Sequence, residues 1–315
     1  MNIAVLDAST LGDDLNLSVF EKVGNVKIYP LTSADELESH TQDADIIVLN
    51  KVKINEETLP NPNKIKLICI AATGFDNVSL DYCKKHGIAL CNVKGYSTNS
   101  VAQVTVAMAL SLSCNLPQYN EFVKDRSYSK SGIQNRLTPV YHELFGKKWG
   151  LVGCGGIGSK VAQVAKALGC EICVCKKTPH AEYENKDIDS LMRDCDIISV
   201  HTPLNEETKN LINRQRIFSM KKNAIFINVA RGGVADEEAL ADAIEEGAIA
   251  GLGIDVYSVE PFSENHPYTR IMHLKNVCLT PHMAWGAYES RQRCMEEIVL
   301  NIKAFNNGEK RNRIV

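Results

Sequence analysis

Short apolar runs rich in strand-forming residues recur along this chain, with helix-like stretches between them. Seven such runs stand at 3–6, 46–49, 67–70, 150–152, 172–175, 197–200 and 224–229. Strands that alternate with helices predict a mostly parallel sheet covered by helices on both faces. The stretch 116–148 interrupts this alternation with polar residues, Gly132 and Pro139, so we expect it to separate two α/β units.

Length and composition agree with two soluble domains. A chain of 315 residues exceeds the size at which a single hydrophobic core usually stops growing. Apolar residues make up 44% of the chain and charged residues 23%, which is ordinary for a globular protein. The net charge is only -3 and the lysines and arginines are dispersed, so we expect neither a nucleic-acid partner nor a membrane partner.

The first residues and the cysteines predict a cytoplasmic protein without a metal site. Residues 1–7 lack the basic region and apolar stretch of a signal peptide, and no later segment approaches 18 uninterrupted apolar residues. Eleven cysteines, several of them inside apolar runs, are typical of buried thiols in a reducing compartment. Cys170 and Cys173 form a C-x-x-C, but it spans a helix end and a strand, and no second pair completes a zinc site.

A glycine-rich turn follows the predicted strand 150–152 and precedes a segment of helical periodicity. Its glycines, Gly153, Gly155 and Gly158, have the G-x-G-x-x-G spacing, and Gly156 and Ile157 lie between them. The first glycine permits a tight turn, the second lets the backbone approach a pyrophosphate, and the third allows close packing of helix on strand. The helix amides and dipole would then face the negative charge, so the segment predicts a dinucleotide site. The alternative is a glycine-rich turn that binds nothing.

Three chemically useful side chains follow later predicted strands. Arg231 follows the strand 224–229, where a guanidinium can hold a carboxylate through two parallel hydrogen bonds. His282 can protonate a carbonyl oxygen as a hydride arrives, and Glu260 can orient the imidazole and favour its charged form. Taken singly, each is more often a solvated or structural residue. Together, at the strand ends of a dinucleotide fold, they predict hydride transfer to a keto acid.

The order of these motifs resembles the D-isomer-specific 2-hydroxyacid dehydrogenases over nearly the whole chain. The glycine loop, Ala230 to Gly232, Asp255 with Glu260-Pro261, and Pro281-His282 carry the resemblance. Four further segments resemble the glycerate dehydrogenase, or hydroxypyruvate reductase, subgroup: 71–74, 95–98, 100–103 and 282–285. Val104 departs from the pattern, because a histidine is common at that position.

The resemblance implies two doubly wound parallel-sheet domains with a cleft between them. A flavodoxin-like substrate domain would comprise residues 1–98 and 287–315, and a Rossmann-type cofactor domain residues 99–286. Backbone amides near Thr73 and Gly74 would bind the substrate carboxylate together with Arg231, and Tyr96 would border the pocket, where His282 would also contact the substrate. The alternative for Thr73 and Gly74 is a turn after a strand. The resemblance also implies a homodimer.

Further cofactor contacts follow from the same resemblance. Asp255 would contact the nicotinamide carboxamide, although an aspartate that closes a strand can also cap a turn. The His201 turn would pass beside the adenosine ribose and phosphates, while the His201 side chain itself is expected to be structural. The remaining implied contacts are Thr202, Pro203, Thr208, Val229, Ala230, Arg231, His282 and Ala284.

The residues at the end of the second cofactor-domain strand favour NADP(H) over NAD(H). NAD-binding folds of this kind place an acidic residue there, roughly 20 residues after the glycines, to accept hydrogen bonds from the adenine ribose. This chain has Lys176, Lys177 and Thr178 instead, which could bind a 2′-phosphate as point charges and a hydroxyl donor. The alternative is two solvated lysines, with NAD held by other contacts.

The sequence thus predicts an NAD(P)-dependent dehydrogenase that reduces a small 2-keto acid, such as hydroxypyruvate or glyoxylate, or oxidises the D-2-hydroxy acid. One alternative is an NAD(P)-sensing binding protein on the same fold. Another is an enzyme for formate, phosphoglycerate or a bulkier keto acid.

Overall fold

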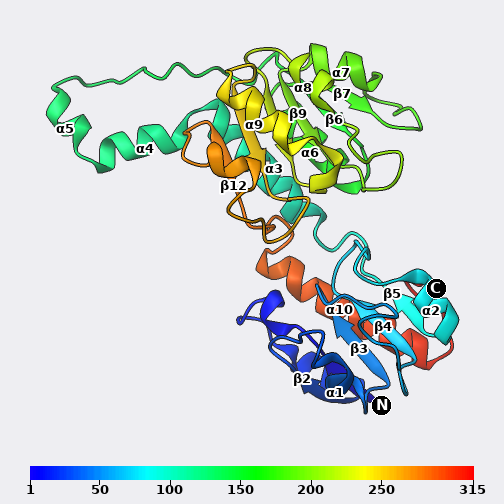
Figure 1. Cartoon of the computed structure of the whole chain (residues 1–315). Coiled ribbons are helices and arrows are strands. Elements are labelled where there is room, and N and C mark those ends of the chain that lie inside the picture. The colour runs from blue at the N-terminus through cyan, green and yellow to red at the C-terminus, as the bar shows by residue number, and fades with distance from the viewer. The chain divides into compact units, whose positions relative to one another are not determined.

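The computed structural model describes the whole chain, residues 1–315, as two compact units. The first unit comprises Met1–Ser97 and Trp285–Val315, and the second comprises Thr98–Ala284. The chain therefore leaves the first unit, forms the second, and returns to finish the first (Figure 1). Each unit has its own parallel sheet.

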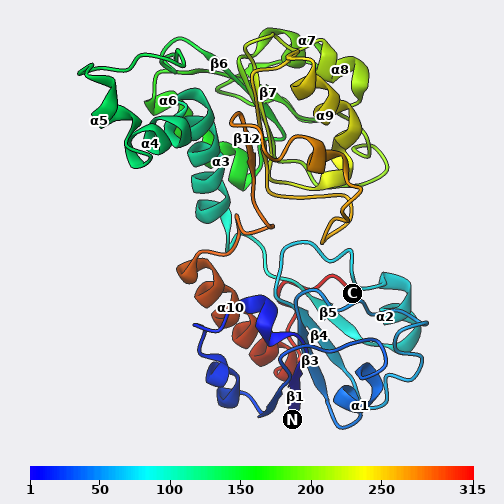
Figure 2. The same cartoon turned by 60° about the vertical axis from the view of Figure 1, so that its left-hand side comes forward.

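The first unit contains a five-stranded parallel sheet in the order β2-β1-β3-β4-β5. Its strands are β1 (Asn2–Val5), β2 (Asn25–Ile28), β3 (Ile46–Leu49), β4 (Leu67–Ile70) and β5 (Ala89–Cys91). Every residue of β3 and β4 is buried, because helices cover both faces. Its α-helices are α1 (Leu37–Thr41), α2 (Leu80–His86) and α10 (Tyr288–Asn306), and Ala8–Leu11 and Leu17–Lys22 are 3-10 helices. Helix α10 packs on one face of the sheet, and α1 and α2 pack on the other (Figure 2).

The second unit contains a seven-stranded parallel sheet in the order β12-β11-β10-β9-β6-β7-β8. Its strands are β6 (Lys148–Val152), β7 (Glu171–Cys175), β8 (Glu184–Asn185), β9 (Ile197–Val200), β10 (Ile225–Asn228), β11 (Gly251–Ile254) and β12 (Val277–Leu279). The strand order reverses between β6 and β9, and ligands of open α/β sheets bind at such a switch point. The expectation of two parallel α/β sheets is confirmed.

Helices cover both faces of this second sheet. They are α3 (Thr98–Ser113), α6 (Gly156–Ala167), α7 (Ile188–Asp194), α8 (Arg214–Phe218) and α9 (Glu237–Glu245), with 3-10 helices at Gly232–Val234 and Pro267–Arg270. Helices α7, α8 and α9 share one core with the inward side chains of β7, β9, β10 and β11. Helices α3 and α6 pack against each other.

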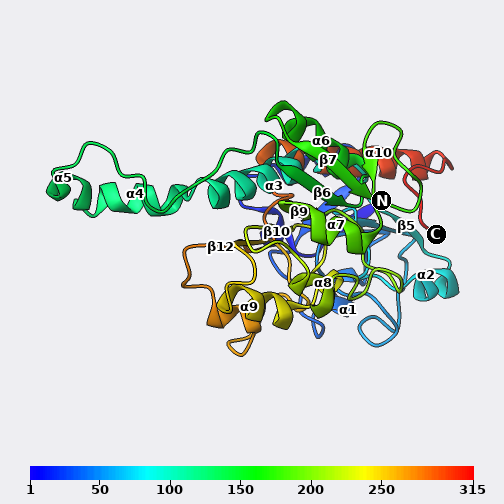
Figure 3. The same cartoon turned by 90° about the horizontal axis from the view of Figure 1, so that it is seen from above.

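Residues 116–145 form an arm that projects from the second unit (Figures 1 and 3). The arm carries α4 (Leu116–Lys124) and α5 (Ser127–Ser131), and neither helix has a buried residue. No single helix of the chain has the length and apolar character to cross a membrane. The bent pair of α3 and α4 satisfies that test by length and composition alone.

Candidate active site

The glycine loop connects β6 to α6 and leaves open space above one of its glycines. Gly153 has φ +91°, and a Cβ atom there would lie 2.9 Å from the His201 carbonyl oxygen. A Cβ on Gly158 would lie 2.5 Å from the Gly153 oxygen, so neither position accepts a side chain. A Cβ on Gly155 would meet nothing within 4 Å. This open position, beside the first amides of α6, fits the pyrophosphate of a dinucleotide.

The segment after β9 lies directly against this loop. A Cβ on Gly153 would lie 3.0 Å from the amide nitrogen of Thr202. The Thr208 hydroxyl donates to the Pro203 carbonyl at 2.6 Å, and it accepts from the Asn205 amide at 2.8 Å. These two bonds give residues 203–208 a fixed turn beside the glycine loop.

His201 is a neutral structural residue within that segment. Its Nε2 lies 2.9 Å from the Ser199 hydroxyl, which also accepts a hydrogen bond from the Trp149 indole nitrogen at 2.9 Å. Its Nδ1 is buried without a hydrogen-bond partner. Burial lowers the pKa of His201 to about 3, so the ring carries no charge near neutral pH.

The end of β7 presents cations and no carboxylate of its own. Lys176, Lys177 and Thr178 are all exposed directly after the strand. Lys177 forms an ion pair with Glu207, which belongs to the turn after β9. The two segments that flank the glycine loop are thereby connected by opposite charges.

Arg231 follows β10 in a segment that hydrogen bonds hold in place. The Asn228 side chain donates to the Arg231 carbonyl at 2.9 Å and accepts from the Ala230 amide at 3.1 Å. The Arg231 guanidinium donates to the Ala230 carbonyl at 2.9 Å. A Cβ on the next residue, Gly232, would lie 2.1 Å from the Ser258 nitrogen, so this segment is pressed against the one that leads to Glu260. Val229, which precedes Ala230, is buried.

Glu260 and His282 form a close pair. The Nδ1 atom of His282 lies 2.5 Å from Oε2 of Glu260, and both side chains are about three-quarters buried. The other carboxylate oxygen of Glu260 accepts from the Tyr257 amide at 3.0 Å. Arg231, Glu260 and His282 thus follow β10, β11 and β12, three neighbouring strands of one sheet. The paired side chains that the sequence indicated are adjacent in space.

Asp255 fixes the backbone segment that carries His282. Its carboxylate accepts from the Thr280 hydroxyl at 2.6 Å, the Met283 amide at 2.8 Å and the Ala284 amide at 2.9 Å. Burial raises the pKa of this carboxyl group, and the three hydrogen bonds oppose that rise. His282 has φ +53°, a left-handed conformation that a side chain adopts only with outside support.

The remaining expected residues, Thr73, Gly74 and Tyr96, belong to the first unit. The Thr73 hydroxyl donates to the Val93 carbonyl at 2.8 Å, and the Asn92 side chain donates to the Thr73 carbonyl at 2.7 Å. Tyr96 is buried, and its ring packs edge-on against Trp285 with centroids 6.4 Å apart.

The sequence did not point to two supporting side chains, Asn92 and Tyr257. Asn92 reaches a carbonyl 19 residues earlier. The Tyr257 hydroxyl reaches a carbonyl 23 residues later. Neither has a local motif that could have revealed it, because each partner belongs to a segment distant in the sequence.

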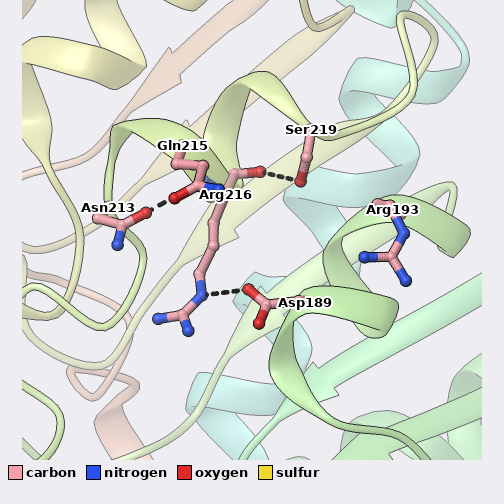
Figure 4. Close-up of a pocket in the computed structure, with 6 residues that line it drawn as sticks. All are labelled: Asp189, Arg193, Asn213, Gln215, Arg216 and Ser219. Carbon is pink, nitrogen blue, oxygen red and sulfur yellow. Dashed lines mark hydrogen bonds and ion pairs between the residues drawn. The ribbon is translucent and has the colours of Figure 1, made fainter.

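A polar pocket of about 330 Å³ lies on the second unit between α7 and α8 (Figure 4). The pocket is lined by Asp189, Arg193, Asn213, Gln215, Arg216 and Ser219. The Arg216 guanidinium donates to the Asp189 carboxylate at 2.7 Å and to the Leu211 carbonyl at 2.6 Å. None of the expected site residues lines this pocket, and its polar groups largely satisfy one another.

Residues 106–284 match the model of the D-isomer specific 2-hydroxyacid dehydrogenase NAD binding domain. The chain belongs to the D-isomer-specific 2-hydroxyacid dehydrogenase family. A hydroxypyruvate reductase of Blautia hydrogenotrophica is 32% identical over 317 residues, which cover 98% of each chain. A glycerate dehydrogenase of Methylorubrum extorquens is 32% identical over 311 residues, again 98% of each chain.

A solved structure extends this likeness to three dimensions. An acyclic imino acid reductase in complex with NADPH and D-Arg matches with a TM-score of 0.88 and 26% sequence identity, over 100% of both chains. The expected family and enzyme class are confirmed: the chain is a nicotinamide-dependent oxidoreductase.

Proposed function

We propose that this enzyme reduces a small 2-keto acid, such as hydroxypyruvate or glyoxylate, to its D-2-hydroxy acid, or catalyses the reverse oxidation. The observation that carries the proposal is the 2.5 Å contact between His282, which follows β12, and Glu260, which follows β11. Arg231 follows β10, the next strand of the same sheet. The hydroxypyruvate and glycerate activities of the two full-length relatives support the substrate class.

Each side chain has a distinct task in this proposal. When bound, the nicotinamide supplies or accepts the hydride. Because Nδ1 of His282 faces Glu260, Nε2 is the nitrogen that delivers a proton to the carbonyl oxygen during reduction. Glu260 holds the ring in a fixed orientation through its contact with Nδ1. Arg231 grips the substrate carboxylate with its planar guanidinium.

The two units have different binding roles in this proposal. We propose that the second unit, residues 99–286 in the expected division, binds the nucleotide through the glycine loop and the turn after β9. Residues 1–98 with 287–315 contribute the substrate side, where Thr73 and Gly74 offer backbone amides to the carboxylate and Tyr96 borders it.

Loss of absorbance at the reduced nicotinamide band tests the reaction. Hydroxypyruvate, glyoxylate, pyruvate and phenylpyruvate are each offered with NADH and with NADPH. We expect turnover with the small keto acids. Fastest turnover of phenylpyruvate would favour an enzyme for bulkier acids. Nucleotide binding without turnover of any of the four would favour an NAD(P)-sensing protein.

We propose that NADP(H) is the preferred cofactor. Lys176 and Lys177 are exposed where a ribose-binding acid would otherwise stand, and a carboxylate there would repel a 2′-phosphate. The contact of Lys177 with Glu207 offsets part of one positive charge, so Lys176 is the cation on which the preference mainly depends.

We also propose a cytoplasmic homodimer that associates through the arm 116–145. Large apolar side chains are widely exposed along the arm: Leu116, Val123, Ile133, Leu137, Val140, Tyr141 and Phe145. Exposed apolar side chains that gather in this way are typical of association sites. A second copy of the chain is the occupant that closed symmetry favours. The eleven free cysteines support a reducing compartment.

A further inference from the structure

Tyr257 contacts both segments that carry the proposed proton-transfer pair. Its backbone amide donates to Oε1 of Glu260 at 3.0 Å. Its phenol hydroxyl donates to the Thr280 carbonyl at 2.9 Å. Thr280 precedes His282 by two residues, so a single residue is bonded to the carboxylate on one side and to the histidine segment on the other.

The Tyr257 ring is held firmly enough to act as a spacer. It is 9% exposed, and it packs against Phe262, His266 and Tyr268 with centroids 4.7, 5.9 and 6.1 Å away. Burial raises the pKa of Tyr257 to about 12, so the hydroxyl remains a protonated donor at any pH that the enzyme meets. A buried tyrosine whose hydroxyl has a fixed partner can transmit position from one segment to another.

The segment that this hydroxyl contacts needs such support. His282 has the left-handed backbone conformation. The Asp255 carboxylate, directly after β11, accepts hydrogen bonds from Thr280, Met283 and Ala284. Asp255 fixes the histidine segment, whereas Tyr257 additionally bonds to the glutamate. The spacing between the two members of the pair therefore depends on Tyr257.

We propose that Tyr257 is a positioning residue that sets the Glu260–His282 contact. This inference rests on the proposed function, in which that contact orients the proton donor. Without the hydroxyl, the Thr280 carbonyl keeps the His282 amide as a donor at 3.0 Å, but it loses the bond that ties this segment to the residue contacting Glu260. The pair then lengthens, and fewer molecules have the imidazole in the productive orientation.

Tyr257→Phe removes only the hydroxyl and keeps the ring and the backbone amide. We expect a roughly 5- to 10-fold fall in kcat for keto-acid reduction, the scale of one lost hydrogen bond. The dissociation constant of NADPH, measured by fluorescence, should stay unchanged. In a Glu260→Gln background the same substitution should cost less than about 2-fold, because the contact it supports is already lost.

A matched control and a spectroscopic signal separate positioning from general stability. Tyr82→Phe removes another buried tyrosine hydroxyl, which donates to the Leu59 carbonyl at 2.7 Å in the first unit. We expect wild-type kcat in that control. The proton shared by His282 and Glu260 should give a downfield proton NMR signal that is absent from Glu260→Gln and weakened or shifted upfield in Tyr257→Phe.

Three results would overturn the inference: wild-type kcat in Tyr257→Phe, an undiminished loss in the Glu260→Gln background, or an unaltered downfield signal. If the wild-type protein turns over none of the keto acids, the proposed function fails. The NMR comparison still decides whether Tyr257 sets the contact.

Discussion

At the scale of single residues, two carboxylates support His282 in different ways. The buried Asp255 carboxylate accepts three hydrogen bonds from the segment 280–284, so it fixes the backbone. Glu260 is partly exposed and contacts the imidazole itself. In the proposed reaction, Asp255 keeps the backbone after β12 in place while Glu260 orients the ring that transfers the proton.

Replacing His282 with alanine should abolish most turnover and leave nucleotide binding intact. The imidazole delivers a proton in the proposed reaction, and general acid catalysis contributes about 10²–10⁴-fold. The glycine loop, which holds the nucleotide in the proposed function, lies at the end of a different strand. Steady-state kcat and the NADPH dissociation constant are measured side by side. Unchanged turnover would remove His282 from the mechanism.

Replacing Glu260 with glutamine should lower kcat for keto-acid reduction and leave nucleotide binding intact. The carboxylate lies 2.5 Å from Nδ1 of His282 and, in the proposed reaction, holds the ring in the orientation that delivers the proton. An uncharged amide is a weaker partner for that nitrogen, so we expect a fall in kcat of roughly 10- to 100-fold, the scale of one lost hydrogen bond to a charged group. Initial rates with saturating keto acid check this, and a fluorescence titration with NADPH checks nucleotide binding. A wild-type kcat would contradict the pairing.

The sequence predicted Arg231, Glu260 and His282 because each follows an apolar strand within a few residues. Parallel strands bring such positions to one edge of a sheet, so chain order alone placed them together. Asn92 and Tyr257 could not be predicted in this way. Their partners are carbonyl groups on other segments, and a carbonyl group carries no residue-specific signal.

At the scale of elements, the buried strands were predictable and the peripheral ones were not. The strands β3, β4 and β9 coincide with the predicted apolar runs. No apolar run predicted β2, an edge strand with mostly exposed residues, or β5 and β8, which have three and two residues. Short or exposed strands lack the apolar run that a fully covered strand needs.

Strand β9 should contribute a pH dependence to stability through His201. Burial lowers the pKa of His201 in the folded protein to about 3, well below its ordinary value of 6.5. The unfolded chain therefore binds a proton below pH 6.5 that the folded chain does not. The contribution of His201 to the free energy of unfolding is fully present above pH 6.5, and it is lost as the pH falls toward 3.

Urea unfolding of the wild type and of His201→Gln between pH 7 and 4 measures this term. The free energy of unfolding of the wild type should fall more steeply, by up to about 1.4 kcal/mol per pH unit below pH 6. The neutral glutamine removes that contribution, whatever other groups titrate. Parallel slopes in the two proteins would mean that His201 is protonated in the folded state.

The end of strand β7 should determine which nucleotide is used. In the wild type we expect kcat/KM for NADPH to exceed that for NADH, and in Lys176→Asp we expect the ratio to fall below one. An aspartate there accepts hydrogen bonds from the ribose hydroxyls and repels a 2′-phosphate.

Lys222→Asp is the matched control for that experiment. It makes the same charge change at an exposed site before β10, at the amino-terminal edge of the sheet. The control should keep the wild-type ratio. A wild-type ratio below one, or equal effects of the two substitutions, would defeat the NADP(H) proposal.

At the scale of the whole molecule, the two ends of the chain form one hydrophobic core and its middle forms another. Helix α10 packs on β1, β3 and β4 through Cys294, Met295, Ile298 and Ile302, more than 200 residues after those strands. Nothing local in 285–315 predicts this return, because an amphipathic helix could cover either sheet. Only the family resemblance implied it.

The arm 116–145 should hold two copies of the chain together. Leu137 and Val140 are 74% and 69% exposed, and neither supports the core of its own unit. Replacing both with aspartate places charge on the apolar surface and should yield a monomer that still binds NADPH. Light scattering after size exclusion should give twice the chain mass of 34.8 kDa for the wild type and that mass once for the double variant.

Leu31→Asp is the control for this experiment, because Leu31 is 63% exposed in the first unit, and this variant should stay dimeric. A double variant that remains dimeric would exclude the arm as the interface, and a monomeric wild type at micromolar concentration would exclude the homodimer.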